Sequence, residues 1–146
     1  MKTELQWLQK MHFMVNIDGF DIEMDANPPF GEAKHPTPKQ LLLASMSGCT
    51  AMDAVSLLAK FKQNLTSLKV VTEAEAVTTY PQVFPEATFS FYAEGTLSPE
   101  KLNESIQLSL SKYCSVNAMV SKVINIKWKA FIAGKPVGEG KAEFNF

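Results

Sequence analysis

The chain of 146 residues is long enough to bury a hydrophobic core, and its content of 46% hydrophobic and 20% charged residues is typical of a globular protein. The net charge of −1, without a basic stripe or an acidic tail, argues against nucleic acid and against an anionic membrane as partners. All 14 basic residues are lysine, so the chain has no guanidinium to form a planar, two-pronged contact with an anion.

The N-terminus predicts a cytoplasmic protein. Residues 1–4 lead into a patterned segment without the apolar core of a signal peptide. The longest apolar stretch, residues 41–59, contains several polar residues, and we expect it to be too polar to span a membrane. In the cytoplasm, two cysteines indicate transient redox chemistry or plain burial rather than a structural disulfide.

The first half of the chain predicts strands followed by one long helix. Apolar residues at mostly even spacing predict strands over residues 4–26, with Asp18-Gly19 as a hairpin turn. A loop with four prolines covers residues 27–38. The sequence Thr37-Pro38-Lys39-Gln40 is typical of a helix start, and we expect the helix to cover residues 38–64. Because this helix is apolar on nearly every side, we expect a sheet and a second subunit to cover it.

The second half predicts two strands, two helices and a final hairpin. The strands are expected over residues 67–79 and 86–96, and Ser98-Pro99-Glu100 begins a helix over residues 98–113. A short helix over residues 115–122 and a hairpin over residues 123–146, turning at Gly134-Lys135, complete the chain. This order predicts a single α+β domain over residues 1–146 with an antiparallel sheet.

Two cysteines are the main candidates for chemistry. Cys49 lies inside the long helix, and Cys114 lies at a junction between helices, 65 positions away. Backbone N–H groups of the turn after Cys114 would lower its pKa, whereas an apolar pocket would raise it. A two-cysteine peroxidase needs one accessible thiolate and one resolving partner. Free cysteine also often serves as a buried packing residue, so that alternative stays open.

Two segments resemble the signatures of the OsmC-like and organic hydroperoxide resistance (Ohr) family. In residues 38–53 a proline opens the helix and a cysteine follows eleven positions later, and residues 112–118 resemble the second signature. The element order is similar over nearly the whole chain, and the closest resemblance is to a subgroup of poorly defined activity. The resemblance implies the OsmC-like fold, with antiparallel sheets packed around the long central helix in an intertwined homodimer.

The resemblance also implies two sites at the subunit interface. In each, Cys49 would attack the peroxide and Cys114 would resolve the sulfenic acid as a disulfide. A dithiol reductant would then reduce this disulfide and restore both thiols.

The chain departs from this family at one pair of residues. Family peroxidases orient the reactive thiolate with an arginine from the N-terminal strands, which is held by a glutamate directly after the helix-opening proline. Here that glutamate position is Lys39, and there is no arginine. Lys39 restores a charge, but it lies ten residues before Cys49, roughly 15 Å along a continuous helix. Contact would need a partner subunit or a break in the helix, and the alternative is a solvated lysine.

Other candidate residues surround the cysteines in the sequence. Asp53, one turn after Cys49, would disfavour a thiolate, or would instead bind a backbone donor of the partner subunit. Glu32, Lys34 and His35 precede the helix and could line the entrance of the site. His12, in a strand, is expected to be structural. Since Cys-x-x-Cys and His-x-x-x-His spacings are absent, we expect no metal site and no cofactor.

Three functions stay open at this point. The first is a thiol-dependent peroxidase for oxidative-stress defence, with an apolar interface pocket that favours organic hydroperoxides. The second is a non-catalytic OsmC-fold dimer that binds a small apolar ligand or senses redox state. The third is a structural dimer in which both cysteines only pack.

Overall fold

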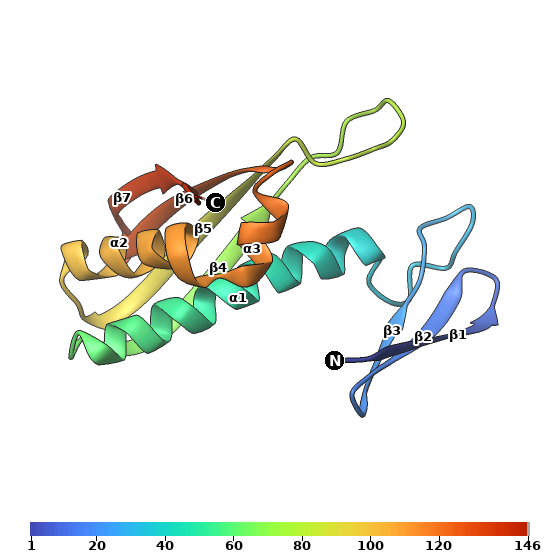
Figure 1. The fold of residues 1–146 in the computed structure, drawn as a ribbon, viewed down its shortest axis with the longest axis horizontal. Coiled ribbons are helices and arrows are strands. Elements are labelled where there is room, and N and C mark those ends of the chain that lie inside the picture. Colours follow the sequence, from blue (N-terminus) through green and yellow to red (C-terminus); the bar gives the residue numbers. More distant parts are fainter. Residues whose placement is uncertain (146) are drawn as a thin grey trace. The chain divides into compact units, whose positions relative to one another are not determined.

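The computed structural model describes residues 1–145 and divides into two compact units (Figure 1). The first unit is Met1–Leu42 and the second begins at Leu43. The expectation of a single domain over residues 1–146 stays a prediction. The α+β class is confirmed, because the chain forms two sheets and one long helix.

Three antiparallel strands form the N-terminal unit: β1 (Thr3–Gln9), β2 (His12–Ile17) and β3 (Phe20–Met24). Asp18 and Gly19 have positive φ values of 46° and 98°, which suits the tight turn predicted between β2 and β3. Residues that pair across the strands point to the same face of the sheet. One face is therefore apolar, and it carries Leu5, Trp7, Phe13, Val15, Ile17, Phe20, Ile22 and Met24.

The long helix α1 (Pro38–Lys60) begins where the sequence predicted. The Gln40 N–H donates to the Thr37 hydroxyl (3.3 Å), and the Thr37 N–H donates to the Gln40 side-chain oxygen (2.7 Å), so the two residues form a reciprocal cap. The helix ends four residues before the predicted end. Lys62 adopts a left-handed φ of 56° and the Gln63 N–H bonds back to the Leu58 carbonyl (3.0 Å), which terminates the helix.

The apolar character of α1 is greater than we expected from its polar interruptions. By length and composition alone it could cross a membrane, although core helices of soluble proteins pass the same test. Within the second unit, one stripe of this helix is buried. Its members recur at helical spacing and are Met46, Thr50, Ala54, Leu57 and Leu58.

A four-stranded sheet in the order β4-β5-β6-β7 forms the base of the second unit. The strands are β4 (Asn64–Glu73), β5 (Glu86–Thr96), β6 (Asn125–Ile132) and β7 (Lys135–Lys141). The strand predicted over residues 67–79 begins three residues earlier and stops at Glu73, so residues 74–85 connect β4 to β5. The last turn is at Ala133-Gly134, one residue before the predicted position, where both residues have positive φ.

The expectation of a purely antiparallel sheet is wrong at one pair of strands. β5 and β6 are parallel, whereas β4–β5 and β6–β7 are antiparallel. A parallel pair needs a long crossover connection. Here the crossover consists of α2 (Pro99–Leu108), a π-helical turn (Ser109–Tyr113) and α3 (Ser115–Val120), so the predicted helix over residues 98–113 is two elements.

The core of the second unit lies between one face of this sheet and the helices. Alternate residues of β5, among them Phe89 and Phe91, are fully buried, as are Leu102 and Ile106 of α2. Figure 1 shows α2 running alongside this sheet, with α3 following it along the chain before β6. The crossover thereby brings the residues after α2 next to the middle of α1.

The burial of one stripe of α1 predicts that two methionines differ strongly in how much their replacement by alanine lowers the free energy of unfolding. Met46 is fully buried, whereas Met119 in α3 is 68% exposed. Met46→Ala should lower the free energy of unfolding by about 2–5 kcal/mol, because it leaves a cavity. Met119→Ala is the matched control and should change it by less than about 0.5 kcal/mol. Urea denaturation measures both, and equal losses would contradict this packing.

Candidate functional site

The structure brings the two cysteines together within the second unit. Both are free thiols, and their sulfur atoms and a carboxylate oxygen of Asp53 all lie within 4.8 Å of one another. The sulfurs of a disulfide are about 2.05 Å apart, so forming the bond would need an approach of less than about 3 Å. Residues 65 positions apart thus lie near bonding range.

A π-helical turn places Cys114. The Cys114 N–H donates to the carbonyl of Ser109, five residues earlier (3.0 Å), and the chain then becomes extended at Cys114 (φ −70°, ψ 100°). The Cys114 sulfur caps α3 by accepting the Asn117 N–H (3.4 Å). Turns of this kind are frequent at functional sites because they reset the direction of side chains within a helix. Here the turn directs the Cys114 sulfur toward α1.

Asn117 connects the two cysteine-bearing segments through its side-chain amide. Its Nδ2 lies within hydrogen-bond distance of the Thr50 hydroxyl (2.7 Å), the Met46 carbonyl (2.9 Å) and the Cys114 sulfur (3.2 Å), so its two N–H groups serve three acceptors and one N–H is shared. A backbone carbonyl can only accept, so Met46 fixes which end of the amide faces α1. All four residues are buried. The amide therefore holds α3 against the turn of α1 that carries Cys49.

Asp53 receives its hydrogen bond from within the same chain. The Ser109 hydroxyl donates to Asp53 Oδ2 (2.8 Å), and Ser109 is fully buried. This bond orients the carboxylate beside the sulfurs. The expectation that Asp53 binds a backbone donor of a partner subunit stays a prediction.

The sequence left open whether the pKa of Cys114 is lowered by the following turn or raised by an apolar pocket, and the structure favours the second. Burial raises the pKa of the Cys114 thiol to about 11, and a hydrogen bond with Cys49 acts in the same direction. The Asn117 N–H and the Thr50 hydroxyl lower this pKa but do not outweigh burial. Cys114 is therefore a thiol at neutral pH, despite its position at the start of a helix.

The two cysteines differ in access to solvent. Cys49 is partly exposed, whereas Cys114 is fully buried behind it. A reagent from solvent would therefore meet Cys49 first. The arrangement suits an attacking sulfur at Cys49 and a resolving sulfur at Cys114.

The same three side chains could in principle hold a metal ion, since two sulfurs and a carboxylate oxygen converge. Cysteine binds metal as a thiolate, and the burial that raises the pKa of Cys114 to about 11 opposes that form. The geometry favours thiol–disulfide chemistry here.

The other predicted site residues belong to the N-terminal unit. Glu32 is ion-paired with Lys10 and Lys34, and hydrogen bonds from these two lysines lower its pKa to about 2. His35 contacts Glu23 through its Nε2 (3.0 Å). Lys39 lies in the first turn of α1. The roles of Glu32, His35 and Lys39 at the cysteine site stay predictions.

Sequence reasoning missed three residues that shape the site: Thr50, Ser109 and Asn117. Thr50 and Asn117 lie inside the two signature segments, next to and three residues after a cysteine, so their positions were a usable signal. Ser109 carried no signal in the sequence. Its carbonyl meets the Cys114 N–H across a π turn, at a spacing of five residues rather than the three or four of an α-helix.

The raised pKa predicts slow alkylation of Cys114. In Cys49→Ser, iodoacetamide at pH 8 should modify Cys114 far more slowly than it modifies Cys49 in Cys114→Ser, because burial keeps Cys114 in the thiol form and shields it from the reagent. The rate should rise about tenfold per pH unit from pH 8 to 10 as the thiolate fraction of Cys114 increases. Mass spectrometry follows the reaction, and circular dichroism checks the fold. Alkylation of Cys114 at pH 8 as fast as that of a free thiol would contradict its burial.

Comparison with known proteins agrees with this architecture. The OsmC-like protein family model matches residues 31–129, which include both cysteines and cross the boundary between the two units. Protein YhfA of Escherichia coli (strain K12) is 31% identical over 128 residues, covering 86% of this chain and 93% of that protein.

Two solved structures extend the comparison. A hypothetical protein from Aquifex aeolicus VF5 superposes with a TM-score of 0.78 at 26% identity, covering 90% of this chain and 96% of the other. An organic hydroperoxide resistance protein OsmC from Legionella pneumophila superposes with a TM-score of 0.66 at 15% identity, covering 88% and 94%, which shows a shared fold. The sequence match and the fold lead to one conclusion: this chain belongs to the OsmC-like protein family.

Proposed function

We propose that this protein is a cytoplasmic thiol-dependent peroxidase that reduces organic hydroperoxides through Cys49 and Cys114, as part of oxidative-stress defence. The observation that carries the proposal is the approach of two free sulfurs to within 4.8 Å, one partly exposed and one buried. Packing alone does not require two distant cysteines to meet beside a carboxylate. The relative from Legionella pneumophila, which is named as an organic hydroperoxide resistance protein, supports the same chemistry.

The first step transfers one oxygen atom to Cys49. Its thiolate attacks the outer oxygen of the hydroperoxide, the O–O bond breaks, and the leaving alkoxide takes up a proton to become an alcohol. Cys49 becomes a sulfenic acid, having lost two electrons to the peroxide. Its partial exposure gives the substrate access to this sulfur.

The second step forms the disulfide. The Cys114 thiol loses its proton, its sulfur attacks the Cys49 sulfur, the S–O bond breaks, and the departing hydroxide takes up that proton to leave as water. The carboxylate of Asp53, held by the Ser109 hydroxyl, is close to both sulfurs and suited to accept that proton. A dithiol reductant then returns both cysteines to thiols by exchange.

The absence of an arginine affects how fast the reaction proceeds, not which cysteines carry it out. A guanidinium would hold a peroxide and a thiolate in a fixed fork, whereas a lysine offers a flexible point charge. We propose that Lys39 of a partner subunit, with Glu32 and His35, lines the entrance to the site. Turnover slower than that of an arginine-containing relative follows from this substitution.

We propose that the protein works as a homodimer. Large apolar residues are exposed on the single chain, among them Trp7 (63%) and Phe20 (76%) on the apolar face of the N-terminal sheet and Met52 (76%) on α1. A shallow apolar depression on the second unit is lined by Ala51, Met52, Val55, Ser56 and Leu68. Exposed apolar surface of this extent is typical of an interface, and a second subunit would also enclose an apolar substrate site beside Cys49.

A non-catalytic OsmC-fold dimer is the alternative, and the raised pKa of Cys114 favours it. A resolving thiol that ionises with difficulty would react slowly with the sulfenic acid, which suits a sensor that stays oxidised long enough to be read. Binding of a small apolar ligand at the interface would need neither sulfur.

Consumption of an organic hydroperoxide tests the proposal. With dithiothreitol as the reductant, the wild type should consume cumene hydroperoxide faster than hydrogen peroxide. Cys49→Ser should abolish consumption above the background rate, because no other group of the mechanism attacks the peroxide. In the absence of dithiothreitol, Cys114→Ser treated with one equivalent of hydroperoxide should retain one added oxygen atom at Cys49, detected by mass spectrometry. Equal consumption by the wild type and Cys49→Ser would exclude the peroxidase.

Two substitutions on β1 test the dimer. Trp7→Lys places a charge on the apolar face of the sheet and should shift the protein toward monomer in analytical ultracentrifugation. Gln6→Lys adds the same charge one residue away on the opposite, polar face and should leave the dimer intact. A wild type that sediments as a monomer would contradict the proposed assembly.

A further inference from the structure

The N-terminal unit holds a second group of ligating side chains, which includes neither cysteine. His12 of β2, Glu23 of β3 and His35 of the loop that follows β3 converge, and one ligand atom from each lies within 4.8 Å of the other two. Glu23 Oε2 is 2.6 Å from His12 Nε2 and 3.0 Å from His35 Nε2. The two imidazole rings are stacked, with centroids 4.7 Å apart and planes 9° apart.

The backbone explains why these residues meet. His12 and Glu23 lie on the polar face of the sheet, as diagonal neighbours on paired strands. His35 returns to that face because the loop is closed at its base, where the Asp25 N–H donates to the Pro36 carbonyl (3.2 Å). The buried carboxylate of Asp25 also accepts the backbone N–H groups of Ala26 (2.7 Å), Glu32 (3.1 Å) and Lys34 (3.3 Å).

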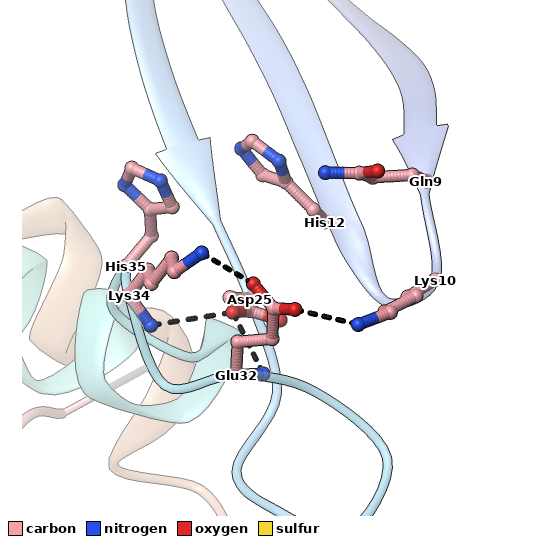
Figure 2. A pocket seen from close by; sticks show the side chains of 7 residues that line it. All are labelled: Gln9, Lys10, His12, Asp25, Glu32, Lys34 and His35. Carbon is pink, nitrogen blue, oxygen red and sulfur yellow. Dashed lines mark hydrogen bonds and ion pairs between the residues drawn. The ribbon is translucent and has the colours of Figure 1, made fainter.

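A cavity of about 100 Å³ adjoins the two histidines. Figure 2 shows the two imidazole rings above the carboxylates of Asp25 and Glu32, with Lys10 and Lys34 on either side of Glu32. Two carboxylates (Asp25 and Glu32) and two ammonium groups (Lys10 and Lys34) line this cavity, and Glu23 adds a third carboxylate against the two histidines. The surplus is negative, which favours a cation.

We propose that His12, Glu23 and His35 form a binding site for a divalent transition metal ion of the zinc type. Two imidazoles and one carboxylate are the protein ligands of several zinc sites that keep an open fourth position. At bond lengths of about 2.0–2.1 Å, tetrahedral ligands lie roughly 3.3 Å apart, close to the separations that Glu23 already has from both histidines. The side chains are 21–36% exposed, so an ion can enter from solvent. The sequence predicted no metal site, because positions 12, 23 and 35 match no local metal-binding motif.

This site does not depend on the peroxidase proposal, and its test removes the sulfurs. The probe is Co²⁺, added to the metal-free full-length protein carrying Cys49→Ser and Cys114→Ser, so that the cysteine cluster cannot bind it. We expect a 1:1 visible d–d absorption band that Zn²⁺ displaces. No spectral change on addition of Co²⁺ would overturn the proposal.

Variants in the same background assign the ligands. Glu23→Gln keeps the shape and the hydrogen bonding of the side chain but loses the anionic ligand, so Co²⁺ affinity should fall by at least about tenfold. His35→Ala should do the same. Glu4→Gln, on the same polar face of β1, is the matched control and should leave affinity unchanged. An affinity unchanged in both Glu23→Gln and His35→Ala, or equally weakened by Glu4→Gln, would overturn the assignment.

A measurement on the Cys49→Ser, Cys114→Ser protein, with no ligand substituted, covers the case in which a ligand variant fails to fold. The chain has two histidines, so their imidazole signals in proton–nitrogen spectra can be followed separately. Zn²⁺ should shift the Nε2 signals of both rings together at one equivalent. Signals that stay in place, or that move for one ring only, would exclude a shared ion and leave Glu23 as a hydrogen-bond acceptor for the histidines.

Discussion

The position of the sulfurs depends on one buried amide. The two N–H groups of the Asn117 amide serve three buried acceptors: a hydroxyl and a carbonyl of α1 and the sulfur of Cys114. Leaving such acceptors without a donor costs roughly 1–3 kcal/mol each, so the amide strongly favours one alignment of α3 against α1. Its own Oδ1 is buried without a hydrogen-bond partner among the described residues. The chain thus accepts an unsatisfied oxygen while keeping the arrangement that holds Cys114 beside Cys49.

The π turn positions the chain before Cys114, and the Asn117 amide positions the chain after it. The turn brings Ser109 to Asp53 and releases the chain into the extended conformation at Cys114, and the amide then fixes the next helix. Burial is the consequence of both. It raises the pKa of the resolving thiol and separates the roles of the cysteines, since only Cys49 meets solvent. In the proposed mechanism, Asp53 is the group that accepts the proton that Cys114 must lose.

The sequence predicted the parts of the fold that depend on local signals. The start of α1 followed from Thr37 and Gln40, and the first hairpin followed from Asp18-Gly19, because caps and tight turns are specified by a few adjacent residues. The parallel pairing of β5 with β6 could not be read locally, since it depends on how the crossover packs. At the site, the signatures identified both cysteines, but Ser109 was hidden by a spacing of five. The convergence of His12, Glu23 and His35 was hidden because a closed loop, not a repeat, brings the last of them back to the sheet.

Oxidation of the reduced protein by one equivalent of an organic hydroperoxide tests the central claim most directly. The digest of the alkylated, unreduced product is mapped by mass spectrometry. The account predicts a disulfide between Cys49 and Cys114 of the same chain, with both free thiols lost together. A product in which Cys49 carries added oxygen while Cys114 keeps its thiol, or in which Cys49 is bonded to a second chain, would contradict it.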